Sequence, residues 1–208
     1  MAQEKLVLDD KDFVGKGCHK LTYIYPGDKK KCIKVIYNKD GITDINRELK
    51  YRKYRDDHKL TSTILPGYYG TVETDKGLGY IFEYVCDYDG KISKTLMDYV
   101  HDEKMLIRDY DKLMPLMAQL KKQLWSDKII SMNITPENIV FQETAPGELK
   151  LYLITDLGVG EIFPFVLYFD SLAYKKIQRR WDKFLRLLPQ EWDSSPTLTK
   201  FTDDLLKL

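Results

Sequence analysis

Hydrophobic and polar residues alternate along the first third of the chain, which is the pattern of half-buried β-strands. Three alternating runs fall within residues 12–37, separated by a glycine pair and by a Pro-Gly-Asp turn. Two more runs, residues 68–73 and 79–85, flank a turn at residues 74–77. The chain therefore begins with a predicted five-stranded antiparallel sheet.

One helix is expected between the third and fourth of these strands. Over residues 43–58, Ile45, Leu49 and Arg52 recur at helical spacing. Thr43 is a suitable N-cap because its hydroxyl can accept a hydrogen bond from the first turn.

The second half of the chain is mainly helical in pattern. Apolar residues recur every three or four positions over residues 110–127, and Pro115 inside this run predicts that the helix begins or kinks near it. A shorter helix is expected at residues 94–100, and a polar loop with a short terminal helix at residues 193–208. Residues 139–142 and 149–155 predict a β-hairpin.

A long amphipathic helix is expected over residues 169–188. Opposite its apolar stripe lie six basic side chains: Lys175, Lys176, Arg179, Arg180, Lys183 and Arg186. Such a helix can lie on anionic lipid or bind a partner. The commoner arrangement, which we predict here, packs the stripe on the domain and leaves the basic residues in solvent.

Composition narrows the class of protein. At 208 residues the chain fits one domain, which can consist of two tightly joined lobes. A net charge of +1 gives no general attraction to nucleic acid. Three scattered cysteines suggest reduced thiols, and neither a signal-like N-terminus nor an apolar run of 18 residues is present. We therefore expect a cytoplasmic protein without a membrane span.

The most informative stretch for chemistry is residues 131–158. It contains a proline-fixed turn, an amide at Asn138, two short β-rich segments and then Asp156-Leu157-Gly158. The hairpin predicted between them would bring Asn138 and Asp156 together. Carboxylate and amide oxygens are ligands for Mg²⁺, and phosphates usually complete its coordination. The pattern therefore predicts a magnesium site of the phosphoryl-transfer type; the alternative is that both are ordinary polar loop residues.

Lys34 is the second candidate, because it lies within an otherwise apolar strand. It either points into solvent from an edge strand or binds phosphate with a helix carboxylate as its partner. Glu48, 14 residues later on the expected helix, is a suitable partner, although alone it reads as a surface charge.

Two further segments are candidates for nucleotide contacts. Gly15 and Gly17 lie between two strands rather than before a helix, which argues against a dinucleotide-binding turn, and no P-loop lysine follows. A plain hairpin turn is the commoner reading of such a pair. Residues 82–85 end the sheet and lead into a connection at residues 86–91. In a two-lobed kinase shape this connection would be the hinge whose backbone groups contact adenine, and Glu83 and Val85 are then candidates for cofactor binding.

Taken together, Lys34, Glu48, Asn138 and Asp156-Leu157-Gly158 resemble the ordered site residues of a protein-kinase-like fold. Residues 31–37, 47–51, 69–75 and 136–139 look more specifically like the bacterial YrbL family, which is named for its place in the PhoP regulatory network. The resemblance implies an α+β, compact two-lobed fold. The sheet and its helix would form an N-lobe, residues 1–86, and the rest a reduced, mainly helical C-lobe, residues 87–208.

The resemblance also implies roles for these residues. ATP and Mg²⁺ would be the cofactors: Lys34 would contact the α/β-phosphates and be held by Glu48, while Asn138 and Asp156 would hold the metal. Asn133 occupies the position of the general base, where it cannot accept a proton as a carboxylate does. Only about ten residues follow Gly158 before the long helix, too few for a long activation segment.

Three functions remain open from the sequence. The first, which we favour, is an atypical phosphotransferase acting on a small molecule or a particular protein. The second is a pseudokinase that binds nucleotide and a protein partner without catalysis. The third is a kinase-shaped scaffold that binds no nucleotide.

Overall fold

The structure is a computed structural model, and it describes residues 5–154, 157–160, 164–188 and 195–208. The chain divides into two compact units, one made of residues 1–46 and 66–86 and the other of residues 47–65 and 87–208. Each unit contains its own cluster of buried hydrophobic side chains. The fold class is α+β, as the sequence predicts.

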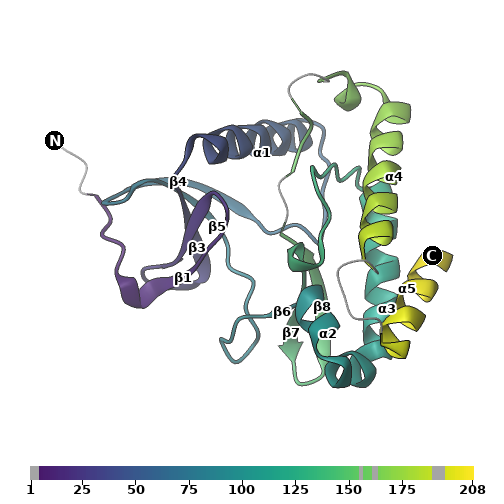
Figure 1. Cartoon of the computed structure of the whole chain (residues 1–208). Coiled ribbons are helices and arrows are strands. Elements are labelled where there is room, and N and C mark those ends of the chain that lie inside the picture. Colours follow the sequence, from purple (N-terminus) through teal and green to yellow (C-terminus); the bar gives the residue numbers. More distant parts are fainter. Residues whose placement is uncertain (1–4, 155–156, 161–163, 189–194) are drawn as a thin grey trace. The chain divides into compact units, whose positions relative to one another are not determined.

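The first unit is built on a five-stranded antiparallel sheet, which confirms the strand prediction (Figure 1). In the order β1-β2-β3-β5-β4, its strands are β1 (Phe13–Lys16), β2 (Lys20–Tyr25), β3 (Asp28–Ile36), β5 (Gly77–Glu83) and β4 (Tyr68–Thr74), and a 3-10 turn, η1 (Asp10–Asp12), precedes them. Ile33 and Val35 are buried in a cluster with Leu8, Tyr23 and Ile81. Since successive side chains of a strand alternate, Lys34 lies on the opposite face.

Helix α1 (Lys39–Asp57) begins four residues before the predicted cap at Thr43, so that prediction is wrong. The side chain of Asn38 accepts a hydrogen bond from the Gly41 N–H at 2.9 Å and caps the first turn instead. Glycine is needed at position 41 because a side chain would not fit there. A Cβ would lie within 3.0 Å of Ile36 and His19.

The buried face of α1 also differs from the predicted one. It contains Ile45, Glu48, Tyr51 and Arg55, whereas Leu49 and Arg52 are only half-buried. The predicted face was chosen by hydrophobicity. The buried face carries the Glu48 carboxylate, which pairs with Arg52 on the same helix, and the Arg55 guanidinium, which binds backbone carbonyls outside the helix.

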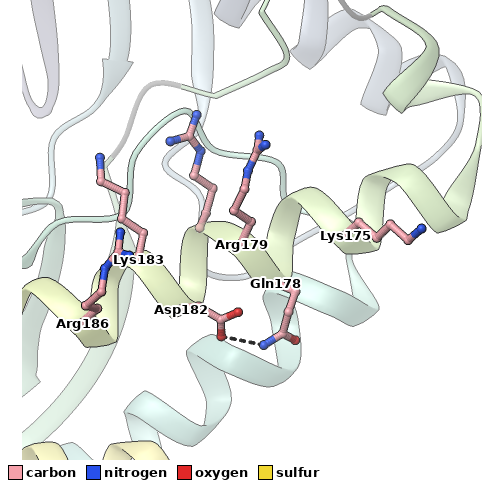
Figure 2. Close-up of a pocket in the computed structure, with 7 residues that line it drawn as sticks. Lys175, Gln178, Arg179, Asp182, Lys183 and Arg186 are labelled. Atoms are coloured by element: carbon pink, nitrogen blue, oxygen red, sulfur yellow. Dashed lines mark hydrogen bonds between the residues drawn. The ribbon is translucent and has the colours of Figure 1, made fainter.

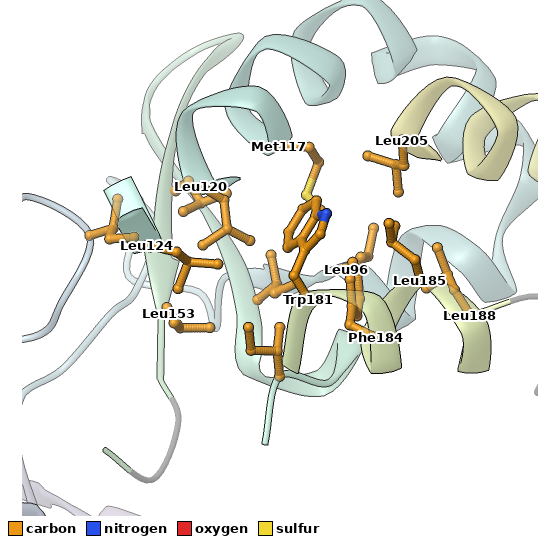
Figure 3. Close-up of a cluster of buried hydrophobic side chains, with 14 of the residues drawn as sticks. Leu96, Met117, Leu120, Leu124, Leu153, Trp181, Phe184, Leu185, Leu188 and Leu205 are labelled. Carbon is orange, nitrogen blue, oxygen red and sulfur yellow. The ribbon is translucent and has the colours of Figure 1, made fainter. Parts of the chain in front are cut away.

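The second unit is mainly helical (Figure 1). Besides residues 47–57 of α1, its helices are α2 (Leu96–His101), α3 (Glu103–Ser126), α4 (Asp170–Leu187) and α5 (Pro196–Lys207). Trp181 of α4 lies among Met117 and Leu120 of α3 and Leu205 of α5 (Figure 3). This confirms that the apolar stripe of α4 is part of a core.

Helix α3 begins earlier than predicted and runs through Pro115. Its first turn is capped by Asp102, whose carboxylate accepts a hydrogen bond from the Met105 N–H at 3.0 Å. The buried stripe from Leu106 to Leu124 continues on both sides of the proline. Burial of that stripe therefore outweighs the single backbone hydrogen bond that the proline removes.

A small three-stranded sheet supports the candidate site. It consists of β6 (Lys94–Thr95), β7 (Ile139–Ala145) and β8 (Glu148–Leu153), and a 3-10 turn, η2 (Pro136–Asn138), leads into β7. The hairpin between β7 and β8 confirms the prediction for this segment. Strand β6 occupies the first two residues of the predicted helix 94–100, where Thr95 caps α2.

No helix in the described part of the chain is both long enough and apolar enough to cross a bilayer.

Candidate functional site

Backbone contacts bring the loop at residues 131–138 beside the segment that follows β8. Ser131 and Leu157 form an antiparallel bridge, and the Gly158 N–H donates to the Ile130 carbonyl at 2.8 Å. At the other end, the Ile154 N–H donates to the Asn138 carbonyl, also at 2.8 Å. Two segments some 20 residues apart in sequence are therefore held together on both sides of residues 155–156. Asp156 itself lies outside the described residues.

Asn138 is suited to serve as an oxygen ligand. Its backbone is fixed, because its N–H donates to the Thr135 carbonyl at 3.0 Å and its own carbonyl accepts from Ile154. Its half-buried side-chain amide enters no hydrogen bond among the described residues. A half-buried amide on a fixed backbone, with no partner among the described residues, has the oxygen donor that a magnesium ligand needs.

Gly158 makes the turn after Asp156 possible. Its φ of +111° lies in the region that favours glycine. A Cβ at this position would come within 3.0 Å of the Arg47 Cγ and 3.2 Å of the Tyr51 Cβ. Both the backbone conformation and the close approach of α1 therefore require glycine here.

Asn133, at the position expected for the general base, is exposed on a loop held by Ser131. The buried Ser131 hydroxyl donates to the Asn133 carbonyl at 2.8 Å and accepts from the Asn133 N–H at 3.1 Å. The Asn133 side-chain oxygen lies 3.5 Å from the Lys183 ammonium of α4. Next to it, the Lys176 ammonium donates to the Met132 sulfur at 3.7 Å. The loop is thus bordered by two cations.

Helix α1 positions the start of this loop. The Tyr51 hydroxyl donates to the Lys128 carbonyl and accepts from the Ile130 N–H at 3.0 Å. The Arg55 guanidinium, nearly fully buried, donates to the Asp127 carbonyl at 2.7 Å. Between these contacts Lys128 adopts a φ of +48°, the left-handed conformation common just beyond a helix end.

Glu48, also on α1, is buried and forms an ion pair that sequence analysis did not anticipate. Its carboxylate accepts from both the Nε and an Nη of Arg52 at 2.9 Å. The i,i+4 spacing of a glutamate and an arginine on one helix was the available signal. Lys34 and Glu48 fall in different units, and the ion pair expected between them stays a prediction.

Lys34 lies on the face of the first sheet opposite the Ile33–Val35 cluster. It is half-buried, with its ammonium 4.7 Å from the centre of the Phe82 ring on β5. Cys32 shares this face, where burial raises the pKa of its thiol. The edge-strand alternative is wrong, because β3 is the central strand of the sheet.

Of the glycine pair, Gly15 lies within β1 opposite Thr22, and Gly17 lies in the turn between β1 and β2. Gly17 donates its N–H to the Lys20 carbonyl at 2.9 Å, and the Tyr37 hydroxyl donates to the Gly17 carbonyl at 2.8 Å. A Cβ on Gly15 would meet no atom within 4 Å, so packing within the protein does not require glycine there. Contact of this turn with phosphate stays a prediction.

Glu83 and Val85 mark the end of the sheet and the chain beyond it. The Glu83 N–H donates to the Gly67 carbonyl at 2.9 Å, while its carboxylate accepts from the Gly67 N–H at 3.0 Å. Val85 is half-buried, and its backbone enters no hydrogen bond among the described residues. Of the two, Val85 is therefore better placed to bind an external group.

The basic face of α4 is more buried than the sequence suggests. Lys175, Arg179 and Arg186 are exposed, as predicted, but Lys176, Arg180 and Lys183 are half-buried. Burial, with added repulsion from Arg180, Arg179 and Arg47, lowers the pKa of Lys176 to about 8. Burial and Arg179 also lower the pKa of Arg180. The prediction of a fully solvated basic face is therefore wrong for half of it.

Comparison with known proteins gives a family. Residues 6–189 match the profile described as PhoP regulatory network protein YrbL. Proteins named "Uncharacterized protein YrbL" from Escherichia coli (strain K12) and Shigella flexneri are each 31% identical to the chain over 180 residues, which cover 86% of this chain and 85% of theirs.

A solved structure also shows similarity. It is a crystal structure of the Mycobacterium tuberculosis PknI kinase domain in a double-mutant form, with a TM-score of 0.48 and 14% sequence identity. The matched region covers 77% of this chain and 65% of that domain.

Proposed function

The chain belongs to the family of the PhoP regulatory network protein YrbL, and on this basis we propose that it binds ATP with Mg²⁺ and acts as an atypical phosphotransferase. The observation that carries the proposal is the pairing of the loop 131–138 with residues 154–158. This pairing holds Asn138 and the residues on both sides of Asp156 in one place. It is an arrangement that a magnesium-bound phosphate requires.

In this proposal each residue has a defined task. Lys34 binds the α/β-phosphates from the face of the first sheet that also carries Phe82. Asn138 and Asp156 hold Mg²⁺, which when bound neutralises charge on the β- and γ-phosphate oxygens. Glu48 would join Lys34 when nucleotide is present, and hydrogen bonds from Arg52 orient its carboxylate in the meantime.

Transfer would break the bond between the γ-phosphorus and the ADP oxygen and form a new bond to an acceptor hydroxyl. The hydroxyl proton would leave to water, because Asn133 has no carboxylate to accept it. Loss of a general base lowers rates by about 10²–10⁴-fold, so we expect slow turnover. Positioning and charge stabilisation, which supply most of the catalysis in phosphoryl transfer, remain available.

Thermal unfolding with and without ATP and Mg²⁺ tests the nucleotide part of the proposal. At a hundredfold excess over Kd, a ligand adds about 2.7 kcal/mol to the free energy of unfolding. We expect this gain in the wild type and its loss in Lys34→Ala and in Asp156→Ala. Lys30→Ala removes an exposed lysine from the same strand and should keep the full gain. An equal gain in all four proteins would refute the assigned site.

A second function, a pseudokinase, is favoured by the environment of Asn133. The Asn133 amide cannot accept the proton of an acceptor hydroxyl, and its neighbour at 3.5 Å is the Lys183 ammonium rather than a carboxylate that could. Transfer of a γ-³²P label from ATP separates the two functions. Label that appears in any acceptor, and that Asp156→Ala abolishes, supports a phosphotransferase. Nucleotide binding with no labelled product supports a pseudokinase.

A further inference from the structure

Helix α4 concentrates positive charge in a chain that is nearly neutral. It carries six basic and two acidic side chains over 18 residues, while the whole chain has a net charge of +1. Among the residues that the structure describes, none of the six basic side chains forms an ion pair. Asp170 is paired with Lys128 at 2.7 Å, so it does not neutralise them.

Three of the basic side chains share a direction. Arg179, Lys183 and Arg186 extend to one side of α4, whereas Asp182 and Gln178 point to the other side and bond to each other at 2.7 Å (Figure 2). All five residues, with Lys175 and Arg180, line a surface depression of about 500 Å³, in which Asp182 is the acidic residue among the described ones. The size of the depression is within the usual range for a small-molecule site.

Two of the basic side chains are partly buried, which destabilises the folded protein unless an anion pairs with them. Lys176 and Arg180 are half-buried beside other cations, and the Arg180 Nε is a buried donor with no partner among the described residues. An unpaired buried charge or donor destabilises the folded protein. Groups held in such positions occur often at functional sites, because the ligand supplies the missing partner.

The charged face borders the candidate site. Lys183 approaches the side chain of Asn133 to 3.5 Å, and Lys176 approaches Met132 to 3.7 Å. All four residues belong to the same unit. An anion held by α4 would therefore lie beside the loop at which the acceptor is expected.

We propose that the basic face of α4 is a binding site for a small molecule that carries a phosphate group, held by Arg179, Lys183 and Arg186. Residues at these spacings span about 10 Å of helix at 1.5 Å per residue, which suits a compact ligand. The planar guanidinium of arginine binds phosphate through two parallel hydrogen bonds, and lysine adds a point charge. The assignment of this ligand as the phosphoryl acceptor rests on the proposed function, but its binding does not.

Binding of inorganic phosphate and of glycerol 3-phosphate to the full chain, without ATP, tests the site. Line broadening in ³¹P NMR and isothermal calorimetry at constant ionic strength measure it directly. We expect saturable binding of the phosphomonoester that weakens about tenfold or more in the Arg179→Gln/Lys183→Gln double variant. The matched control, Lys104→Gln/Lys122→Gln, removes two exposed lysines of α3 and should bind as the wild type does.

Three results would overturn the proposal. One is an absence of saturable binding of either phosphate probe to the wild type. Another is equal weakening in both double variants, which would mean diffuse attraction by net charge. The last is binding to vesicles containing phosphatidylserine that requires Arg179 and Lys183 while the soluble phosphates do not bind, which would assign the face to a membrane surface. Circular dichroism of each variant shows that it is folded.

The test also separates this proposal from the proposed function. Phosphate binding that survives Lys34→Ala and Asp156→Ala, in a protein that gains no stability from ATP, would retain the α4 site and reject the nucleotide site. ATP-dependent stabilisation without phosphate binding would retain the nucleotide site and reject the α4 site.

Discussion

At the scale of single residues, Lys176 is the clearest case of a partly buried charge that lowers the stability of the folded protein. Its pKa falls to about 8 because it is partly buried and because Arg180, Arg179 and Arg47 repel its charge. The folded protein therefore holds the proton less well than the unfolded chain does. Below about pH 8 the folded state bears the full cost of the charge, and the cost fades as pH rises toward the usual lysine value of about 10.5.

We predict that Lys176→Met raises the urea midpoint of unfolding at pH 7 and raises it much less at pH 10. The substitution removes a charge that is unfavourable only while it is protonated. Lys175→Met is the control for loss of one exposed charge from the same helix. A gain in stability of equal size at both pH values would show that packing, rather than charge, is the cause.

Gly158 gives a second prediction at this scale. Gly158→Ala should lower the free energy of unfolding by about 1–3 kcal/mol, because alanine is strained at a φ of +111° and its Cβ would crowd Arg47 and Tyr51. Gly160→Ala, two positions away, has open space and no positive φ and should cost less than about 0.5 kcal/mol. Equilibrium urea unfolding measures both, and equal costs would contradict the assigned role of Gly158.

At the scale of elements, the last turns of α1 hold the end of α3 and the entry to the loop 131–138. Arg55 donates to carbonyls of Asp127 and Lys128 on one side and of Leu60 and Thr61 on the other. The buried Arg55 side chain thus donates hydrogen bonds to backbone carbonyls in two separate loops. These bonds hold the segment that leads into the candidate site.

Arg55→Met should therefore lower the free energy of unfolding by about 2–4 kcal/mol, since it leaves several carbonyls without donors. Lys53→Met on the same helix removes an exposed ion pair with Asp57 and should change the free energy of unfolding by less than about 1 kcal/mol. Chemical denaturation of the two variants makes the comparison. Similar losses in both would mean that the carbonyl contacts contribute little.

The elements themselves were predictable to different degrees. Strands of the first sheet follow from alternation, because β2, β3 and β5 each bury residues of one face in a small cluster. The start of α1 was missed because Thr43 was chosen as the cap, whereas Asn38 caps the helix earlier. Pro115 was predicted to start or kink the helix, but the apolar stripe of α3 continues through it. Local signals fail where tertiary burial outweighs them.

The backbone pairing at the candidate site was predictable from the sequence, whereas the contacts of its charged side chains were less so. Adjacent strands β7 and β8 bring Asn138 close to Ile154, as hairpin pairing requires. The pairing of Glu48 with Arg52 lies within one helix, whereas the approach of Lys183 to Asn133 depends on packing between distant segments. Sequence spacing could suggest the first of these and had no means of suggesting the second.

At the scale of the whole molecule, the two units have separate and unequal cores. The cluster in the first unit contains five buried residues around Ile33, whereas the cluster in the second includes the buried stripes of α3, α4 and α5. Small cores are more easily weakened, because each residue supplies a larger share of the burial.

We predict that Ile33→Ala increases amide hydrogen exchange throughout β1 to β5 and leaves the amides of α3 near wild-type protection. Loss of a fully buried isoleucine costs about 2–5 kcal/mol, and the units can open separately if their cores are independent. Leu113→Ala in α3 is the reciprocal variant. Loss of protection across both units from either substitution would show that they unfold together.

The boundary between the two units falls within helix α1: residues 39–46 belong to the first unit and residues 47–57 to the second. Cutting the polypeptide between Cys86 and Asp87 would consequently not yield two fragments that each contain a complete compact unit. The amino-terminal piece would carry away Tyr51 and Arg55, and the remainder would lose the groups that shape the entry to residues 131–138. Split-protein reconstitution at that junction should thus restore order in both pieces at once.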